Sequence, residues 1–365
     1  MSRCPTCGNN YPDDANFCTR DGTRLIGTAA NPPTAVPVSS ESSVSTRLQT
    51  AKSARAERNA SALGHSQLVG STLQGRYEIV RKVGEGGMSF VYLANDIATR
   101  ERYAIKVLSS SLSQDANAMA RLKREASLGM RLAHPNVCHI IRLGETEDGL
   151  VYVVMPFVEG EILADRTMRL GQISLAETAR FLRDMAAGLT VAHQLKIVHR
   201  DLKPENVMIS KQQGGRDYAV VLDFGLAKER RAGGELQKLT ATGIILGTPE
   251  FMSPEQLRGK TLDARTDIYS LGLMTYEMLT GKLPFQGRTQ QEMMIARLRS
   301  DPLPLKKLRP DIEFPEAIER VLARSIARDP EDRYQTAAEF SDAFSAAAER
   351  SGSGDSGLLG KLFGR

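Results

Sequence analysis

A short polar run, IVHRDLKPEN, spans Ile197 to Asn206 and brings an aspartate, a lysine and an asparagine close together in the chain. A DFG tripeptide that begins at Asp223 follows it. Transfer of a phosphoryl group needs a base near the attacking hydroxyl, metal ligands near the phosphates, and positive charge to offset the negative charge that develops in the transition state. Asp201 could supply the base and Lys203 the charge. Asn206 and Asp223 could supply oxygen ligands for magnesium.

The polar residues of the run lie between two candidate strands, IVH (residues 197–199) before them and VMI (residues 207–209) after them. Together with DFG it resembles the catalytic loop and metal-binding segment of the eukaryotic-type serine/threonine protein kinases, which in bacteria are the Hanks-type kinases. The resemblance implies an α+β, two-lobed protein kinase fold, with a small β-rich lobe and a large helical lobe, over residues 73–347. It also implies transfer of the γ-phosphoryl group of Mg-ATP to serine or threonine of protein substrates. Lys203 and the pair Gly247-Thr248 resemble the serine/threonine class.

Two alternating segments, YEIVRKV and FVYLAND, have the pattern of strands and flank a glycine-rich turn, GEGGMS. Glycine there lets the backbone close over phosphates, because a side chain would hold the ligand away. The turn resembles the nucleotide loop of the family, with its third glycine replaced by Ser89. The resemblance assigns nucleotide binding to Val83, Gly84, Glu85, Gly86, Gly87, Ser89, Val91, Ala104, Lys106, Met155, Pro156, Val158 and Met208.

The same resemblance indicates how an adenine ring would be held. Val91, Ala104 and Met208 would lie against its faces. The carbonyl of Pro156 and the backbone of Val158 would meet its edge, and a proline is acceptable there because only a carbonyl is required.

Lys106 ends the apolar strand candidate AIK, where an unpaired cation would be costly, so it needs an acidic partner. Glu125 is the candidate, in a helix predicted from Gln114 to Leu132 by apolar residues at three- and four-residue spacing. The family keeps a glutamate there that pairs with the lysine in the active enzyme. The alternative is that Glu125 is a solvated partner of Arg121 on the same helix.

The stretch from Asp223 to Glu255 corresponds to the activation segment of the family. Phosphate on Thr242, or on Thr240, could order it through new contacts with arginines such as Arg200. The position of Thr242 before GIILGTPE favours it slightly over Thr240. By the same resemblance, Glu255 would pair with Arg333.

Two apolar helices are predicted in the larger lobe, from Thr178 to His193 and from Thr266 to Thr280. The second is apolar nearly all round, which is typical of a buried central helix, and Gly281 would end it. Asp267, near its start, would be a costly buried charge unless it accepts hydrogen bonds from the backbone of the catalytic loop, residues 197–206. That agrees with the role the family gives it.

The first 26 residues form a module of their own that resembles a small zinc ribbon. The sequences CPTCG and CTRDG are two knuckles, in which an aspartate stands in place of the fourth cysteine. Three sulfurs and one oxygen can complete a tetrahedral zinc site, whose ligands would be Cys4, Cys7, Cys18 and Asp21. The alternative is a degenerate ribbon that has lost its metal.

Beyond these modules the composition changes. Residues 27–72 are rich in Ala, Ser, Thr and Pro, which predicts a flexible linker. Residues 348–365 are predicted to be a disordered tail with a short apolar end, which could dock on a partner or a membrane or simply fray.

The overall composition limits which other classes of protein and which other functions fit this sequence. Hydrophobic residues make up 41% and charged residues 25% of the 365, which is ordinary for a globular protein. The net charge of +5 is thinly spread, so nucleic-acid binding is not expected, although an adaptor role for the ribbon could coexist with catalysis. We expect a cytoplasmic protein without a transmembrane segment, possible homodimerisation for autophosphorylation in trans, and protein substrates. The alternatives are a pseudokinase or scaffold that binds ATP without turnover, and a small-molecule phosphotransferase.

Overall fold

The structure, a computed structural model, describes residues 68–86, 89–108, 116–212, 214–224 and 249–353, and near the N-terminus residues 2–3 and 10–11. It divides into two units, Met1–Ala62 and Leu63–Arg365. In the first unit the described residues form one antiparallel pair of strands, β1 (Ser2–Arg3) and β2 (Asn10–Tyr11). The four predicted zinc ligands and the predicted phosphorylation sites lie outside the described residues.

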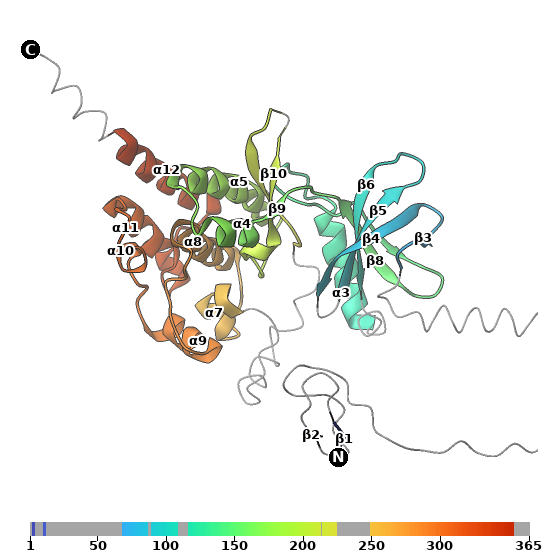
Figure 1. The fold of residues 1–365 in the computed structure, drawn as a ribbon, viewed down its shortest axis with the longest axis horizontal. Helices are drawn as coiled ribbons and strands as arrows, with labels where there is room; N and C mark the ends of the chain where they lie inside the picture. The colour runs from blue at the N-terminus through green and yellow to red at the C-terminus, as the bar shows by residue number, and fades with distance from the viewer. Residues whose placement is uncertain are drawn as a thin grey trace, which may run out of the picture. The chain divides into compact units, whose positions relative to one another are not determined.

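The small lobe of the second unit is built on a six-stranded antiparallel sheet with the order β3-β4-β5-β6-β8-β7 (Figure 1). The strands are β3 (Thr72–Leu73), β4 (Tyr77–Gly86), β5 (Ser89–Asp96), β6 (Arg102–Leu108), β7 (Arg142–Glu145) and β8 (Val151–Pro156). Helix α3 (Ala116–Gly129) buries Leu122 and Ala126 in a cluster with Val151 and Val153 of the sheet. The predicted strands on both sides of the glycine-rich turn and the predicted helix are therefore confirmed.

The predicted linker extends too far toward the small lobe. Residues 68–72 were expected to belong to it, but Gly70 donates its N–H to the Ile79 carbonyl, 2.9 Å away, and Ile79 donates to the Ser71 carbonyl at 2.9 Å. Thr72 then pairs with Glu78 as the start of β3. The polar composition of the segment hid this short strand, which is held by backbone pairing with β4 and by Leu73, a buried member of the small-lobe core.

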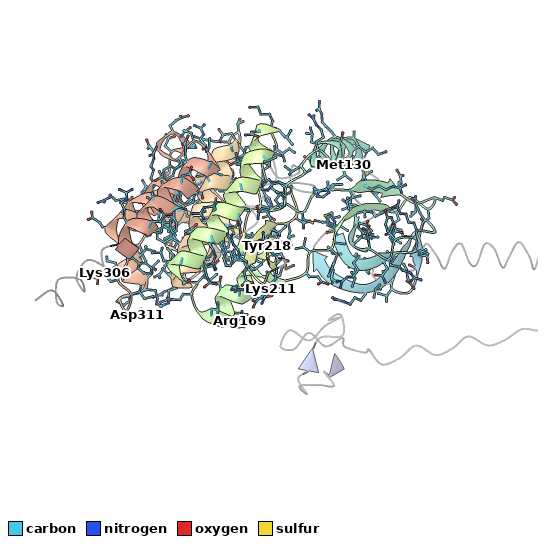
Figure 2. The ribbon with its side chains drawn as sticks, turned by 90° about the horizontal axis from the view of Figure 1, so that it is seen from above. Met130, Arg169, Lys211, Tyr218, Lys306 and Asp311 are labelled. Atoms are coloured by element: carbon cyan, nitrogen blue, oxygen red, sulfur yellow. The ribbon has the colours of Figure 1, made fainter. Side chains whose placement is uncertain are left out.

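The large lobe is helical apart from one small sheet of order β11-β10-β9. Its strands are β9 (Glu161–Ile162), β10 (Val207–Lys211) and β11 (Asp217–Val221). Its helices are α4 (Leu163–Leu170), α5 (Leu175–Gln194), α7 (Pro254–Leu257), α8 (Ala264–Thr280), α9 (Gln290–Arg299), α10 (Leu305–Leu308), α11 (Glu316–Ser325) and α12 (Ala337–Ser353), with 3-10 turns η1 (Pro204–Asn206), η3 (Pro249–Phe251) and η4 (Pro330–Asp332). Figure 2 shows the β10–β11 hairpin, marked by Lys211 and Tyr218, beside the long helix α5.

Helix α8 is the centre of the large lobe, as its sequence predicts. Nearly every residue from Thr266 to Thr280 is buried. The Asp263 side chain caps its N-terminus by accepting from the Arg265 N–H. At its C-terminus Gly281 has a φ of 69°, and a Cβ there would collide with the Gly171 carbonyl, so glycine is required both by the backbone and by the space.

Two further local predictions differ from the structure. The IVH segment before the catalytic loop is not a strand, because the His199 N–H donates to the Asp267 carboxylate and not to a neighbouring strand. Helix α12 continues to Ser353, past the predicted boundary at Ala347, and the first residues of the extension, Ala348, Glu349 and Arg350, are good helix formers. Among the described residues, we find no helix with the length and apolar character needed to cross a bilayer.

Candidate active site

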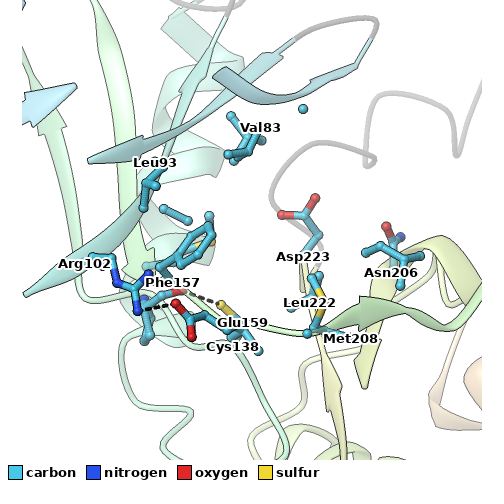
Figure 3. A pocket seen from close by; sticks show the side chains of 18 of the residues that line it. Val83, Leu93, Arg102, Cys138, Phe157, Glu159, Asn206, Met208, Leu222 and Asp223 are labelled. Carbon is cyan, nitrogen blue, oxygen red and sulfur yellow. Dashed lines mark hydrogen bonds and ion pairs between the residues drawn. The ribbon is translucent and has the colours of Figure 1, made fainter. Parts of the chain in front are cut away.

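A cavity of about 600 Å³ lies between the sheet of the small lobe and the β10 region of the large lobe (Figure 3). Ten of the residues that the sequence predicts for nucleotide or magnesium binding line it: Val83, Gly84, Val91, Ala104, Met155, Pro156, Val158, Asn206, Met208 and Asp223. They come from β4, β5, β6, β8, η1 and β10 and from the segments that follow β8 and β11, so distant parts of the chain line one cavity, and their role in binding stays a prediction.

Other predicted nucleotide residues lie at the tip of the β4–β5 hairpin. Gly86 pairs with Ser89 where the two strands close, and Gly87 lies outside the described residues. Glu85 is exposed and forms an ion pair with Lys82. Their role in binding stays a prediction.

The sequence did not indicate several side chains at the mouth of the cavity. Arg102 of β6 forms an ion pair with Glu159, which follows β8, and its guanidinium lies 5.9 Å from the centre of the Phe157 ring. Cys138 is buried, and its thiol lies 3.5 Å from the Pro156 carbonyl oxygen (Figure 3). Burial raises the pKa of this thiol to about 12, so it is a packed side chain and not a nucleophile.

Lys106 is buried at the back of the site and has an acidic partner there. Its Nζ lies 2.8 Å from Oδ2 of Asp223, which follows β11. Burial acts to raise the pKa of the Asp223 carboxyl, but the charge of Lys106 and the hydrogen bond from it outweigh burial and hold that pKa below its ordinary value. Glu125 lies half-buried on α3, and its predicted pairing with Lys106 stays a prediction.

Asp223 has a strained backbone that its neighbours must hold. Its φ of 54° lies in the left-handed region, which costs a non-glycine residue about 1–3 kcal/mol. The next residue, Phe224, is buried and packs edge-to-face on His199 with ring centres 4.8 Å apart. The ion pair with Lys106 on one side and this ring contact on the other fix where the carboxylate points.

One buried carboxylate, that of Asp267, binds the backbone of the catalytic loop. Asp267 of α8 accepts the N–H groups of His199, at 2.8 Å, and Arg200, at 2.9 Å. It also lies 2.8 Å from Nε2 of His193 at the end of α5. The prediction that Asp267 accepts hydrogen bonds from this backbone is therefore confirmed.

Within the loop, the hydrogen bonds define the state of His199 and the position of Asp201. Asp201 donates its N–H to Nδ1 of His199 at 3.3 Å, so Nε2 carries the proton and donates to the Leu222 carbonyl at 2.8 Å. The Asn206 amide donates to both the carbonyl and the Oδ2 of Asp201, at 2.8 and 3.2 Å. Lys203 Nζ lies 3.8 Å from the same Oδ2, which brings the predicted base and the predicted cation together.

Far from the cavity, the predicted pair of Glu255 and Arg333 is confirmed as a buried, bidentate ion pair. Both N–O distances are 2.8 Å, and Arg333 is fully buried. Thr266 also donates to Glu255 at 2.8 Å. The pair anchors α7, which directly follows η3, to the helical core.

Glu277 of α8 is subject to the charges of two other glutamates of the large lobe, Glu205 of η1 and Glu250 of η3. Burial, with the repulsion of the other two carboxylates, raises the pKa of Glu277 to about 7. A carboxyl whose folded pKa lies above its unfolded value favours the folded state at low pH, and this contribution is lost as the pH rises through the folded pKa.

Glu277→Gln should therefore stabilise the protein more at high pH than at low pH. From the pKa, we expect the gain in the free energy of unfolding to be about 2 kcal/mol larger at pH 8.5 than at pH 5.5. Urea unfolding at both pH values would measure it, with Glu316→Gln, at an exposed position, as the control. A gain that does not change with pH would contradict the titration of Glu277.

Comparisons with known proteins agree with this geometry. The family profile described as the protein kinase domain matches residues 77–344. The serine/threonine-protein kinase pkn3 of Myxococcus xanthus is 35% identical over 274 residues, which are 75% of this chain and 50% of that protein. The serine/threonine-protein kinase PknB of Mycolicibacterium smegmatis is 38% identical over 271 residues, which are 73% of this chain and 42% of that protein.

A solved structure is similar as well. The crystal structure of the PknI kinase domain of Mycobacterium tuberculosis matches with a TM-score of 0.59 and 27% identity, over 76% of this chain and 98% of that domain. The chain spans half or less of the length of the two curated relatives.

Proposed function

Because this chain belongs to the protein kinase family, we propose that it is an ATP-dependent serine/threonine protein kinase. One observation carries the proposal. Asn206 of the catalytic loop lines the same cavity as Asp223, and Asp223 is paired at 2.8 Å with Lys106. The pseudokinase alternative is disfavoured because Lys106, Asp201 and Asp223 are all present.

In the proposed reaction, Asp201 accepts the proton of the substrate hydroxyl as its oxygen attacks the γ-phosphorus of ATP. The new O–P bond forms while the bond between the γ-phosphorus and the bridging oxygen breaks, and ADP leaves with the electron pair. Lys203, 3.8 Å from the Asp201 carboxylate, offsets the negative charge on the transferred group. The two hydrogen bonds from Asn206 hold Asp201 in the orientation that this step requires.

The donor set fits a magnesium ion. The low pKa of Asp223 keeps its carboxylate charged, and Asn206 donates through its amide nitrogen, which leaves its side-chain oxygen as a ligand. Asp223 and Asn206 would hold the ion. When bound, magnesium neutralises phosphate charge and orients the phosphates.

For the nucleotide base, the cavity offers a flat apolar slot. Val91 and Ala104 come from neighbouring strands of the small lobe, and Met208 comes from β10 of the large lobe. The Pro156 carbonyl receives a long contact from the Cys138 thiol, and its second lone pair can accept a hydrogen bond from the adenine edge.

Incubation of the purified chain with γ-labelled ATP and magnesium tests the proposal. We expect phosphate on serine or threonine, and mass spectrometry should find it on Thr242 or Thr240 in the wild type but not in Asp223→Ala, which loses the metal ligand. Phosphate on neither threonine would remove the proposed switch in the activation segment. No transfer to the chain itself or to a general acceptor such as casein would contradict the kinase assignment.

The N-terminal module is proposed to hold one zinc ion through Cys4, Cys7, Cys18 and Asp21. The pairing of β1 with β2 supports this, because it brings together the residues that precede and follow the CPTCG sequence, Arg3 and Asn10. Metal analysis of the whole chain should give about one equivalent of zinc, and Cys18→Ser should lose it. Less than half an equivalent in the wild type would favour the degenerate ribbon.

Two further proposals concern the cellular location of the protein and phosphorylation of one copy by another. We propose that the protein works in the cytoplasm, where ATP is plentiful, and that two copies meet for phosphorylation in trans. An autophosphorylation rate per molecule that rises with protein concentration would support the meeting of two copies, and a rate independent of concentration would contradict it.

A further inference from the structure

Gln256 connects the helix that follows η3 to the catalytic loop. Helix α7 starts with a capping box, in which Ser253 Oγ accepts the Gln256 N–H at 3.3 Å and Gln256 Oε1 accepts the Ser253 N–H at 3.0 Å. The oxygen of the Gln256 amide is therefore engaged locally. This leaves the amide nitrogen, Nε2, to make a contact outside the helix.

That contact is with the catalytic loop. Nε2 of Gln256 donates to the Arg200 carbonyl at 2.7 Å, across 56 positions of sequence. The assignment of nitrogen and oxygen in this amide follows from the two partners, since a flipped amide would turn an N–H₂ group toward the Ser253 N–H and an oxygen toward the Arg200 carbonyl. The bond is thus specific to an amide side chain.

Arg200 is a residue whose backbone needs such support. Its φ is 64°, in the left-handed region that non-glycine residues rarely adopt. Its N–H is bound by Asp267 of α8 at 2.9 Å and its carbonyl by Gln256 of α7. Two separate helices therefore hold the two polar groups of this one residue.

The Arg200 carbonyl matters because it belongs to the same planar peptide unit as the N–H of Asp201. If this unit rotates, the Asp201 side chain changes direction. On the other side of Asp201, the Asn206 amide binds its carbonyl at 2.8 Å. Gln256 and Asn206 together fix both peptide planes that flank the proposed base.

We infer that Gln256 is a positioning residue for Asp201, through which the end of the activation segment sets the orientation of the base. The inference rests on the proposed kinase function. Two neighbouring side chains of α7 make different contacts. Glu255 anchors the helix to Arg333 in the core, and Gln256 binds the catalytic loop. A shift of α7 would be transmitted to Asp201 by a direct hydrogen bond.

The expected signature is a loss of turnover without a loss of nucleotide binding. A misplacement of about 1 Å at a catalytic group can reduce the rate about a hundredfold. Among the described residues that line the nucleotide cavity, Gln256 does not occur, so its removal should leave ATP affinity unchanged.

The test compares three variants of the full chain. Gln256→Glu keeps an oxygen for the Ser253 N–H but turns a second oxygen toward the Arg200 carbonyl. Gln335→Glu is the matched control, because Gln335 also donates through Nε2 to a backbone carbonyl, that of Arg333 at 2.9 Å. Ser253→Ala removes one bond of the cap and keeps the Gln256 side chain, which separates loss of helix capping from loss of positioning.

We expect Gln256→Glu to lower kcat by about 10- to 100-fold with KM for Mg-ATP within about twofold of the wild type. Hydrogen exchange at the amides of residues 199–206 should be faster in this variant. Gln335→Glu and Ser253→Ala should keep both kcat and exchange near wild-type values.

An unchanged kcat in Gln256→Glu while the wild type is active would overturn the inference, and so would unchanged exchange in residues 199–206. An equal loss of kcat in Ser253→Ala would also overturn it, because capping alone would then explain the effect. If the wild type itself transferred no phosphate, the proposed function would fail, and the exchange measurement would still decide whether Gln256 holds the loop.

Discussion

Asp201→Asn should lower kcat for phosphoryl transfer by about a thousandfold, while the Kd for Mg-ATP stays close to that of the wild type. The amide side chain has nearly the same shape as the carboxylate but cannot accept the proton of the substrate hydroxyl. The backbone carbonyl at this position would still accept from Asn206, so the loop geometry survives. Binding also survives, since the cavity is formed by other residues.

Single-turnover transfer to a protein acceptor and calorimetric titration with Mg-ATP would measure the two quantities separately. Asp311→Asn is a suitable control, because Asp311 is an exposed carboxylate paired only with its neighbour Arg309. That control should leave both quantities unchanged. A decrease in kcat of less than tenfold for Asp201→Asn would mean that another group takes the proton.

Motifs predicted the parts of the site whose chemistry requires particular residue types. Lys106 and Asp223 were both assigned to one nucleotide site, and the structure brings them within 2.8 Å. The hydrogen bonds to Asp267 were predictable for a different reason: a carboxylate inside an apolar helix must find donors, and the catalytic loop offers backbone N–H groups. The first inference came from the resemblance to the kinase family, and the second from the cost of an unpaired buried charge.

Contacts that depend on the path of the backbone could not be predicted in this way. The left-handed conformations of Arg200 and Asp223 have no signal in the sequence, because non-glycine residues adopt them only where their surroundings hold them there. The partner of Gln256 follows from the Arg200 conformation, so it was missed as well. Its neighbour Glu255 was found only because the family keeps an ion pair there.

Arg297 of α9 was missed because arginine is usually exposed. Its side chain is buried and donates to the carbonyls of Pro249 and Met252, which hold η3 in place. Burial lowers the pKa of its guanidinium. A helix with polar residues on half of its positions gives no sign of which polar side chain is buried, and the packing of α9 against η3 decides it.

The second large effect concerns stability. Arg333→Met should lower the free energy of unfolding by about 3–5 kcal/mol, because it leaves the buried Glu255 carboxylate without its partner. Arg333 also donates to the carbonyls of Ala327 and Arg265, and these would lose a donor too. Arg328→Met is the control, since Arg328 pairs with the exposed Asp301 and should contribute at most about 1 kcal/mol.

The pH dependence of the free energy of unfolding distinguishes loss of this ion pair from loss of packing in Arg333→Met. In the wild type, burial acts to raise the pKa of Glu255, but the hydrogen bond and charge of Arg333 lower it below its ordinary value. The pair therefore stabilises the fold above the unfolded pKa of the carboxyl, and this contribution is lost as the pH falls through the folded pKa. In Arg333→Met the charge and the hydrogen bonds of Arg333 are gone, and burial is opposed by the hydrogen bonds from Thr266 and the backbone, so the folded pKa rises and the carboxyl destabilises the fold as the pH increases. The stability deficit of the variant, measured by urea unfolding, should consequently be larger at pH 8 than at pH 5. The double variant Glu255→Gln with Arg333→Met should remove that difference.

An equal deficit at the two pH values would show that Arg333 acts by filling space and by its bonds to carbonyls, and not through the charge of Glu255.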